Sequence, residues 1–437
     1  MGPWSSQPPT SFVLSLLLLA LVGSTVASLF NAWPTPVRAR ILVWIMAIAS
    51  IVGVFITVLV VSAQDVPIVV VAPLGALVII LGVQAISQRR PPSNRLLAIL
   101  AVAYLGLVIM AILTSSGIID VELFVRGGLD ALSAGQSPYA ITIDNPYGPN
   151  ETALFYGPGV VEDGRVVYGY PYLPATLLLD LPAHLVADAV WMHLAAMAFA
   201  IALAWRMATD QVGRAAVAML ALTHSTPWLI LHYWIEPVII GFFTLTVWGL
   251  TRGRRWAVVM GLAMVFSSKQ YAVFFLPAVW PVLRTAGLRT LVAATALGCV
   301  IVGGFVMMDP HAFFRSVVEL QLLQPFREDS ISLLPGVQAV LGDLPNGLLV
   351  GLPFVGIAVS GVVAWRTESG PTAFALCVGL GLLATVLVSK QAFVNYYMMA
   401  GSALLLAGVT WPIDDPVQTR DPLSQGSRGS RGMSKTR

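Results

Sequence analysis

The sequence predicts an all-α polytopic membrane protein, and three observations support that prediction. First, 57% of the 437 residues are hydrophobic and 10% are charged, whereas about 25% of residues are charged in soluble domains. Second, apolar runs close to the roughly 20 residues that span a bilayer recur along the chain. Third, most of the 24 basic residues lie in alternate connections between those runs, which the positive-inside rule marks as cytoplasmic.

The apolar runs predict about thirteen membrane helices. Three of them, 11–32, 41–61 and 67–85, belong to an N-terminal addition that comprises residues 1–95. The main membrane domain comprises residues 96–411, with apolar runs at 96–113, 173–184, 186–205, 215–231, 238–251, 256–266, 271–283, 291–308, 348–365, 372–388 and 393–411. The short run 173–184 contains two prolines and is expected to be half-buried or re-entrant. The polar tail 412–437 is expected to be a disordered cytoplasmic segment. The two cysteines, Cys299 and Cys377, lie within apolar runs and are interpreted as small core residues.

The longest polar interval, residues 115–174, carries more acidic than basic residues and is therefore placed on the outer side. Within it, residues 121–134 have apolar positions at helical spacing, with Glu122, Arg126 and Asp130 on the opposite side. This pattern predicts an amphipathic helix on the outer membrane surface with successive i,i+4 ion pairs. Repeated Gly and Pro after Gly135 predict a loop. A second outer segment is expected at 309–346.

Asp120 directly follows an apolar run, where the chain leaves lipid for water. A carboxylate at that level can act as a general base towards a substrate bound in an outer cavity. The alternative is that Asp120 caps the amphipathic helix. We take Asp120 as the catalytic candidate, and Glu122 as a candidate for substrate contact.

Lysine usage singles out two other positions. The chain has three lysines, and two of them occur in the same tripeptide, Ser-Lys-Gln, as Lys269–Gln270 and Lys390–Gln391. Both tripeptides are predicted at outer helix ends, where basic residues are disfavoured. Each lysine could simply extend to the interface from a helix end. Their recurrence, with Arg315 and Arg327 in the second outer segment, favours a site for an anion such as a lipid-linked phosphate.

The segment 232–236 reaches the outer side and contains His232 and Glu236, which could line the same cavity. Its Tyr233 and Trp234 also fit an interfacial aromatic belt. No spacing of His, Cys, Asp or Glu resembles a metal site, and no nucleotide-binding glycine motif occurs. We therefore expect no metal, no cofactor and no nucleic-acid partner.

These residues resemble those of the GT-C membrane glycosyltransferases, most of all the polyprenyl-phosphomannose-dependent mannosyltransferases of glycosyltransferase family 87. The resemblance covers about residues 96–411. The matching features are Asp120, the surface helix 121–134, the Gly-x-x-Pro-Tyr element 135–139, the Tyr-Pro element 170–174, the Lys-containing break 268–270 and the block 390–397. Family members carry a second proline where this chain has Tyr172.

The resemblance implies a GT-C-like bundle and an inverting hexosyl transfer on the extracytoplasmic side of the cell membrane. The donor would be a polyprenyl-phosphate sugar, with mannose as the expected sugar, and the acceptor a glycolipid or glycan. Asp120 would be the base, and Lys269, Gln270, Lys390, Gln391 and Arg327 would hold the donor phosphate. Other substrate contacts would come from Glu122, Tyr139, Tyr170, His232, Glu236, Asn395 and Tyr396.

A multi-pass transporter or lipid flippase is the alternative function. Transporters place ionisable groups near the bilayer midplane on broken helices. Here the ionisable groups concentrate towards the outer surface, and only Asp180, Asp188 and His193 lie where a midplane site is expected.

Overall fold

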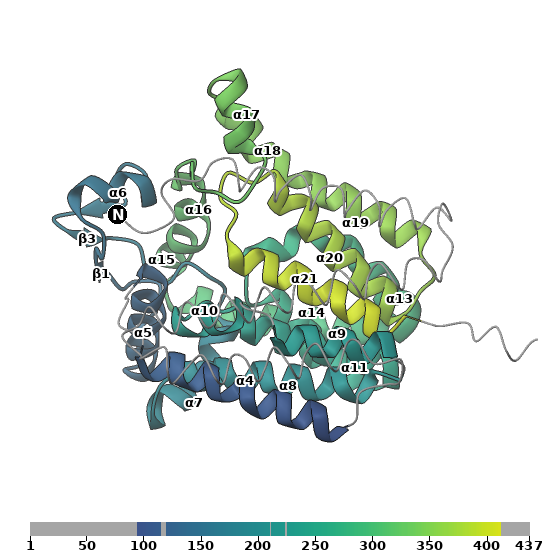
Figure 1. Ribbon diagram of the computed structural model, residues 1–437. Coiled ribbons are helices and arrows are strands. Elements are labelled where there is room, and N and C mark those ends of the chain that lie inside the picture. Colours follow the sequence, from purple (N-terminus) through teal and green to yellow (C-terminus); the bar gives the residue numbers. More distant parts are fainter. Residues whose placement is uncertain (1–93, 115–118, 210, 223–224, 412–437) are drawn as a thin grey trace, which may run out of the picture.

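The computed structural model describes residues 94–114, 119–209, 211–222 and 225–411 (Figure 1). The three spans expected before residue 94 and the tail 412–437 lie outside the described residues. The described part is mostly helical. Three of its stretches are long and apolar enough to cross a membrane: α8 (Val190–Met207), α14 (Leu288–Met308) and the continuous stretch Asn346–Arg366. This composition of helices is that of a membrane-embedded protein.

The stretch Asn346–Arg366 consists of α18 (Asn346–Gly351), the 3-10 turn η3 (Leu352–Phe354) and α19 (Val355–Arg366). The other bundle helices are α4 (Asn94–Thr114), α9 (Gln211–Leu222), α10 (Ser225–Leu231), α11 (Glu236–Arg252), α12 (Arg255–Phe266), α13 (Val279–Ala286), α20 (Pro371–Leu387) and α21 (Val394–Val409). Most expected spans are confirmed as helices within a few residues of their expected ends.

Two helices, α11 and α20, form the centre of the bundle. Nearly all of their side chains are buried, and Phe243 of α11 stacks on Phe374 of α20 with ring centroids 5.2 Å apart. α11 packs against α12, α8 and α21, and α20 packs against α19 and α21. Small residues permit this close approach. A Cβ built on Gly261 would lie 2.6 Å from the carbonyl oxygen of Phe242 in α11.

The run 215–231 is helical on both sides of residues 223 and 224, as α9 and α10. Two expectations need correction. The run 271–283 begins as a 3-10 helix, η1 (Gln270–Ala278), which contains Pro277. The region after Gly135 is not only loop, since it contains α6 (Pro149–Phe155) and a small antiparallel sheet in the order β1-β3-β2.

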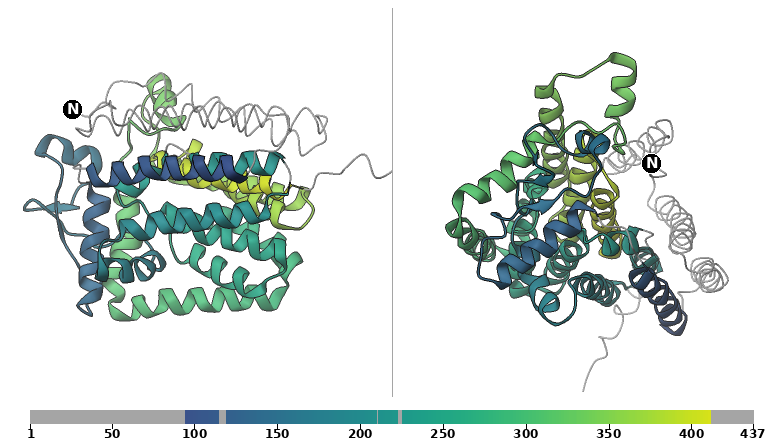
Figure 2. Two further views of the ribbon diagram at one scale, coloured as in Figure 1. Left: turned by 60° about the horizontal axis from the view of Figure 1, so that its bottom comes forward. Right: turned by 90° about the vertical axis from the view of Figure 1, so that its left-hand side faces the viewer.

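The sheet consists of β1 (Ile143–Asp144), β2 (Val161–Glu162) and β3 (Arg165–Val166), with Val166 opposite both Ile143 and Val161. The run expected to be re-entrant forms α7 (Ala175–Val186), which packs on α5 (Asp120–Ser133), α8 and α12. α5 itself confirms the predicted amphipathic helix. It stands across one end of the bundle, beside the sheet and the helix that begins at α15 (Pro310–Phe314) (Figure 2).

Helix α15 continues through a π-helical turn, η2 (Arg315–Glu319), into α16 (Leu320–Leu323). The chain then leads to α17 (Leu334–Leu341), which projects from the bundle (Figure 1). Of the segments that the sequence singled out for chemistry, Asp120 begins α5, Gln270 contacts η2 and Lys390 contacts α16. The candidate site is therefore at one end of the helix bundle.

Candidate functional site

Hydrogen bonds gather four separate segments at this end of the bundle. The amide of Gln270 donates to the carbonyl oxygens of Pro171 (2.7 Å) and Val317 (2.9 Å), which ties the tyrosine-rich loop and η2 to the start of η1. Lys390 donates to the carbonyl of Gln324 at 2.5 Å, which ties the α20–α21 connection to the end of α16. The Ser-Lys-Gln tripeptides therefore lie at the same end of the bundle as Asp120.

Asp120 is the first residue of α5, and its side chain is half-buried. Its Oδ1 accepts a hydrogen bond from the backbone N–H of Val121 (2.8 Å), and its Oδ2 accepts one from the hydroxyl of Tyr156 (2.9 Å). The helix cap is Ile119, which has no side-chain cap bond. The alternative role of Asp120 as an N-cap is therefore wrong. One carboxylate oxygen is held by a tyrosine from the loop 36 residues further along the chain.

Burial raises the pKa of the Asp120 carboxyl above its ordinary value. Hydrogen bonds from Tyr156 and Tyr147 and the positive charge of Arg327 oppose this rise. A carboxylate with a raised pKa is a stronger base while remaining ionised above that pKa, which suits proton abstraction from a hydroxyl. Sequence reasoning singled out Asp120 and missed Tyr156 and Tyr147.

Arg327 reaches the neighbourhood of Asp120 through aromatic contacts. Its guanidinium lies 4.2 Å from the ring centroid of Phe155 and 5.0 Å from that of Phe393. Phe155 in turn stacks on Tyr147 at 3.7 Å. Arg327 also forms a bidentate pair with Asp329, at 2.7 and 2.6 Å. The guanidinium is thus held in place by a carboxylate on one side and by two rings.

Lys390 lies beside the same segment, because the backbone N–H of Arg327 donates to the carbonyl of Lys390 (3.2 Å). Its ammonium group donates to the carbonyls of Leu322 (3.4 Å) and Gln324. Among the described residues, no carboxylate lies within ion-pair distance of it. Burial lowers its pKa. Gln391 donates to the side chain of Gln324 (3.1 Å) and the carbonyl of Pro325 (2.9 Å), so it holds this connection in place.

Lys269 is buried, with 4% of its surface exposed, and it already has an anion. Its ammonium lies 2.5 Å from Oε1 of Glu236, which is fully buried at the start of α11. Asn395 of α21 donates to the same oxygen at 2.9 Å. The rings of Tyr172, Tyr271 and Tyr396 surround the ammonium at 4.7, 5.3 and 4.7 Å. The cation that the sequence predicted to need an anion is therefore paired within the chain.

Tyr172 contacts the Lys269 ammonium through its ring and also experiences the charge of Asp120. Burial raises its pKa, and the nearby negative groups Glu236 and Asp120 raise it further, so both carboxylates act on the same phenol. Its backbone carbonyl accepts from the hydroxyl of Tyr139 at 3.1 Å. The sequence pattern treated Tyr172 only as a departure from a Tyr-Pro-Pro element. In the structure it connects the two halves of the candidate site.

Tyr139 and Tyr170 are almost completely buried within the loop. Their rings meet edge to face at 6.1 Å, and the hydroxyl of Tyr170 is 2.8 Å from that of Thr176. The backbone at residue 169 passes so close to Tyr139 that only glycine fits there. A Cβ on Gly169 would lie 2.2 Å from the carbonyl oxygen of Tyr139. These two tyrosines pack the loop, while Tyr172 and Tyr396 contact the cation.

The ion pairs predicted along α5 are half correct. Arg126 pairs with Glu122 at 2.9 Å, but its second partner is Asp188, at 3.0 Å, rather than Asp130. Asp130 meets His184 of α7 at 2.9 Å instead. Tyr233 donates to Asp188 and accepts from Arg126 at 2.5 Å. The prediction that Tyr233 belongs to an interfacial belt is wrong, because it is buried in this network with a left-handed backbone (φ 57°).

Two further polar groups are buried away from Asp120. His232 packs edge to face on Trp228 at 4.2 Å, and neither ring nitrogen has a hydrogen-bond partner among the described residues. That His232 and Glu236 line one cavity stays a prediction. Asp180 of α7 and His193 of α8 form a fully buried pair at 3.1 Å. No family model, curated protein or solved structure matches the chain.

Proposed function

We propose that the protein is an integral membrane glycosyltransferase with a GT-C-like bundle of about thirteen spans. It transfers a hexose, with mannose as the proposed sugar, from a polyprenyl-phosphate donor to a glycolipid or glycan acceptor. The reaction takes place at the extracytoplasmic surface of the cell membrane and needs no cofactor. The observation that carries this proposal is the half-buried Asp120 carboxylate, which is held by Tyr156 and lies within the electrostatic influence of Arg327, whose backbone N–H donates to the carbonyl of Lys390.

In the proposed step, Asp120 accepts the proton of an acceptor hydroxyl. The acceptor oxygen forms a bond to the anomeric carbon, and the bond from that carbon to the phosphate oxygen breaks. The sugar is transferred with inversion, and polyprenyl phosphate leaves with the electron pair. Orientation of both substrates beside one base lowers the barrier because a bimolecular encounter becomes effectively unimolecular.

The leaving phosphate gains negative charge, so cations aimed at it stabilise the transition state. Lys390 suits this role best, since it has only neutral carbonyl partners among the described residues. Arg327 is a second candidate that acts electrostatically on Asp120, although Asp329 already pairs with its guanidinium. Lys269, because it is paired with Glu236, contributes by fixing Tyr172 and Tyr396. Gln270 and Gln391 hold the loop and the α20–α21 connection against α16.

The test compares sugar transfer from radiolabelled polyprenyl-phosphomannose by membranes that contain wild type, Asp120→Asn or Asp144→Asn. Asp144 is the matched control, because it is an exposed carboxylate of β1 in the same polar interval, paired with Arg165. Loss of a general base typically lowers the rate by about 10²–10⁴-fold. We expect that loss for Asp120→Asn and near-normal transfer for Asp144→Asn. Normal transfer by Asp120→Asn, with equal protein present, would remove Asp120 as the base.

A transporter is the second candidate function, and one observation favours it. Asp180 of α7 and His193 of α8 are completely buried, and Oδ1 of Asp180 and Nδ1 of His193 have no hydrogen-bond partner among the described residues. Ionisable groups inside a membrane domain commonly mark ion or proton pathways. Proton-coupled solute uptake into proteoliposomes that is abolished by His193→Phe, while Asp120→Asn has no effect, would favour transport over transfer.

A further inference from the structure

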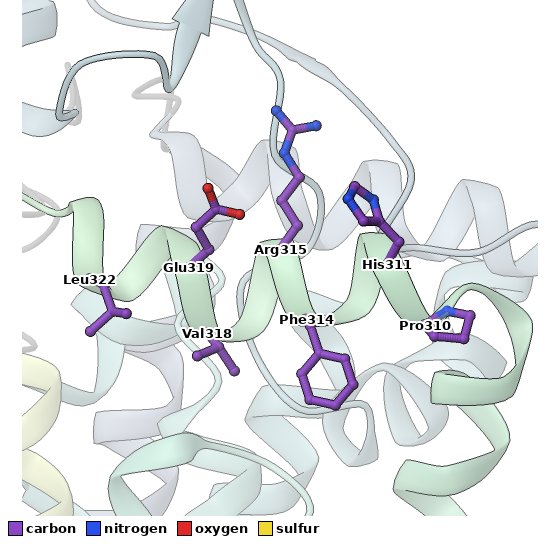
Figure 3. Close-up of a pocket in the computed structure, with 7 residues that line it drawn as sticks. All are labelled: Pro310, His311, Phe314, Arg315, Val318, Glu319 and Leu322. Atoms are coloured by element: carbon purple, nitrogen blue, oxygen red, sulfur yellow. The ribbon is translucent and has the colours of Figure 1, made fainter.

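The helix formed by α15, η2 and α16 has three distinct faces. Its inner face packs on the protein through four buried residues, Phe313, Ser316, Val317 and Leu320. A second face is apolar but exposed, with Phe314 at 56%, Val318 at 47% and Leu322 at 61%. A third face carries His311, Arg315 and Glu319 at four-residue spacing. In Figure 3 the polar side chains extend to the upper edge of the outer surface of this helix and the apolar ones to its lower edge.

The exposed apolar face follows the exposed apolar helix α14 in the chain. That helix has a 21-residue apolar stretch of which little is buried, and it ends at Met307 and Met308, with Met307 84% exposed. The chain enters α15 two residues later. A helix with one apolar and one polar outer face, joined to the end of a span, belongs at the boundary between acyl chains and headgroups. The polar face therefore lies at headgroup depth.

A depression of about 480 Å³ runs along this helix, between the polar and the apolar faces. Arg315 is stacked on Tyr168 at 4.4 Å, and the Tyr168 hydroxyl donates to Glu319 at 3.2 Å. Within the described part of the chain, Arg315 forms no salt bridge. Arg315 also hydrogen-bonds Tyr168, and the five N–H donors of a guanidinium leave others that can reach a phosphate. His311, one turn away, adds a ring N–H donor.

We propose that this depression binds one anionic phospholipid of the surrounding leaflet as a bound, non-reacting lipid. Its phosphate lies on Arg315 and His311, and one acyl chain follows Phe314, Val318 and Leu322. Two features of the helix support this occupant: the cation is oriented beside an exposed apolar face, and the helix is joined directly to the end of the apolar span α14. This site takes no part in the proposed transfer reaction, because the lipid that it binds is not a substrate.

A lipid bound in this depression would also stabilise the candidate site. Ser316 on the inner face accepts from the N–H of Gly169 (2.9 Å) and donates to the carbonyl of Tyr139 (3.1 Å). Together with the Tyr168–Glu319 bond, these contacts fix the stretch of chain that leads to Tyr172. A lipid that steadies this helix therefore also steadies the tyrosine beside Asp120 and Lys269.

The test is native mass spectrometry of delipidated full-length protein in detergent, titrated with phosphatidylglycerol or with phosphatidylcholine of the same chain length. The measurement is made in the Asp120→Asn background, so it does not depend on transfer. Loss of one charge-assisted phosphate contact weakens binding by about tenfold or more. We expect that loss for Arg315→Gln and no loss for Arg165→Gln, an exposed arginine of β3 in the neighbouring loop. Phe314→Ser should weaken binding of the long-chain lipid without changing the fold, because its ring is exposed.

Equal uptake of phosphatidylglycerol by Arg315→Gln and Arg165→Gln would overturn the proposal. Equal affinity for phosphatidylcholine would show an unselective apolar surface and overturn it as well. Displacement of the lipid by millimolar inorganic phosphate would mean a site for a soluble anion, which is also a refutation. None of these outcomes bears on whether Asp120 is a base, which the transfer assay decides separately.

Discussion

The buried pair between Lys269 and Glu236 allows a sharp test of what holds this end of the bundle together. In Lys269→Met, the fully buried Glu236 carboxylate keeps only the hydrogen bond from Asn395. Removal of one partner from a buried ion pair costs about 3–5 kcal/mol, because the remaining charge is neither solvated nor neutralised. The favourable contacts of the ammonium with three tyrosine rings are lost as well.

The measurement is thermal unfolding of the detergent-solubilised protein for wild type, Lys269→Met, Glu236→Gln and the double variant. We expect each single variant to be strongly destabilised. The double variant should be less destabilised than the sum of the two, because it leaves no unpaired charge. Lys390→Met is the matched control, since that half-exposed ammonium contacts only carbonyl oxygens. Its loss of stability should be smaller.

The reasoning is refuted if Lys269→Met unfolds at the wild-type temperature, or if the effects of the two single variants simply add. The double variant also separates structure from chemistry. If it recovers stability and transfers sugar, Lys269 holds the loop. If it recovers stability and binds donor poorly, Lys269 contacts the donor directly.

Three other predictions concern single residues. Burial lowers the pKa of His232 from 6.5 to about 4. As the pH drops from 6.5 to about 4, the unfolded chain therefore binds a proton at His232 that the folded protein does not bind. The free energy of unfolding falls by up to about 3 kcal/mol over that interval. His232→Phe should flatten this part of a stability–pH curve, and an unchanged curve would show that His232 is not its source. Because the pKa of Asp120 is raised, the rate of sugar transfer should decline as the pH falls through that raised value. Tyr156→Phe removes a hydrogen bond that lowers this pKa, so the acid limb of the curve of transfer rate against pH should move to higher pH. A limb at the same pH in both proteins would contradict this assignment. Gly169→Ala places a methyl group against the backbone of Tyr139, and we expect faster proteolysis of the loop, which limited trypsin digestion measures.

The membrane class and most helix positions could be predicted because hydrophobicity is a local property of the chain. A run of apolar residues must find lipid or protein interior whatever its neighbours are, so α4, α8, α14 and α20 are found close to where their composition places them. The amphipathic α5 was equally predictable, since its apolar side chains recur at helical spacing. Broken elements were less predictable. The 3-10 start of the run 271–283 was not predicted, although Pro277 is a local signal against a regular α-helix there.

The candidate site was predicted only in part. Asp120 and the two lysines stood out by position and rarity, and the structure brings them to one end of the bundle. The anion for Lys269 was not found, although a carboxylate at Glu236 inside apolar sequence is itself a signal that a buried cation is near. Tyr156 and Tyr147, which hold and tune Asp120, lie in a segment whose Gly and Pro content predicted only loop.

By itself, then, composition and spacing determined that this chain is a membrane protein, where most of its described helices run, and which polar segments interrupt them. Only the tertiary structure decided which polar groups meet. Glu236, Lys269 and Asn395 come from α11, the start of η1 and α21, and Asn395 lies 159 residues beyond the carboxylate that it contacts. The physical reason is that burial of apolar surface acts on each segment separately, whereas a buried charge is stable only beside a specific partner, and that partner is supplied by helix packing rather than by sequence neighbours.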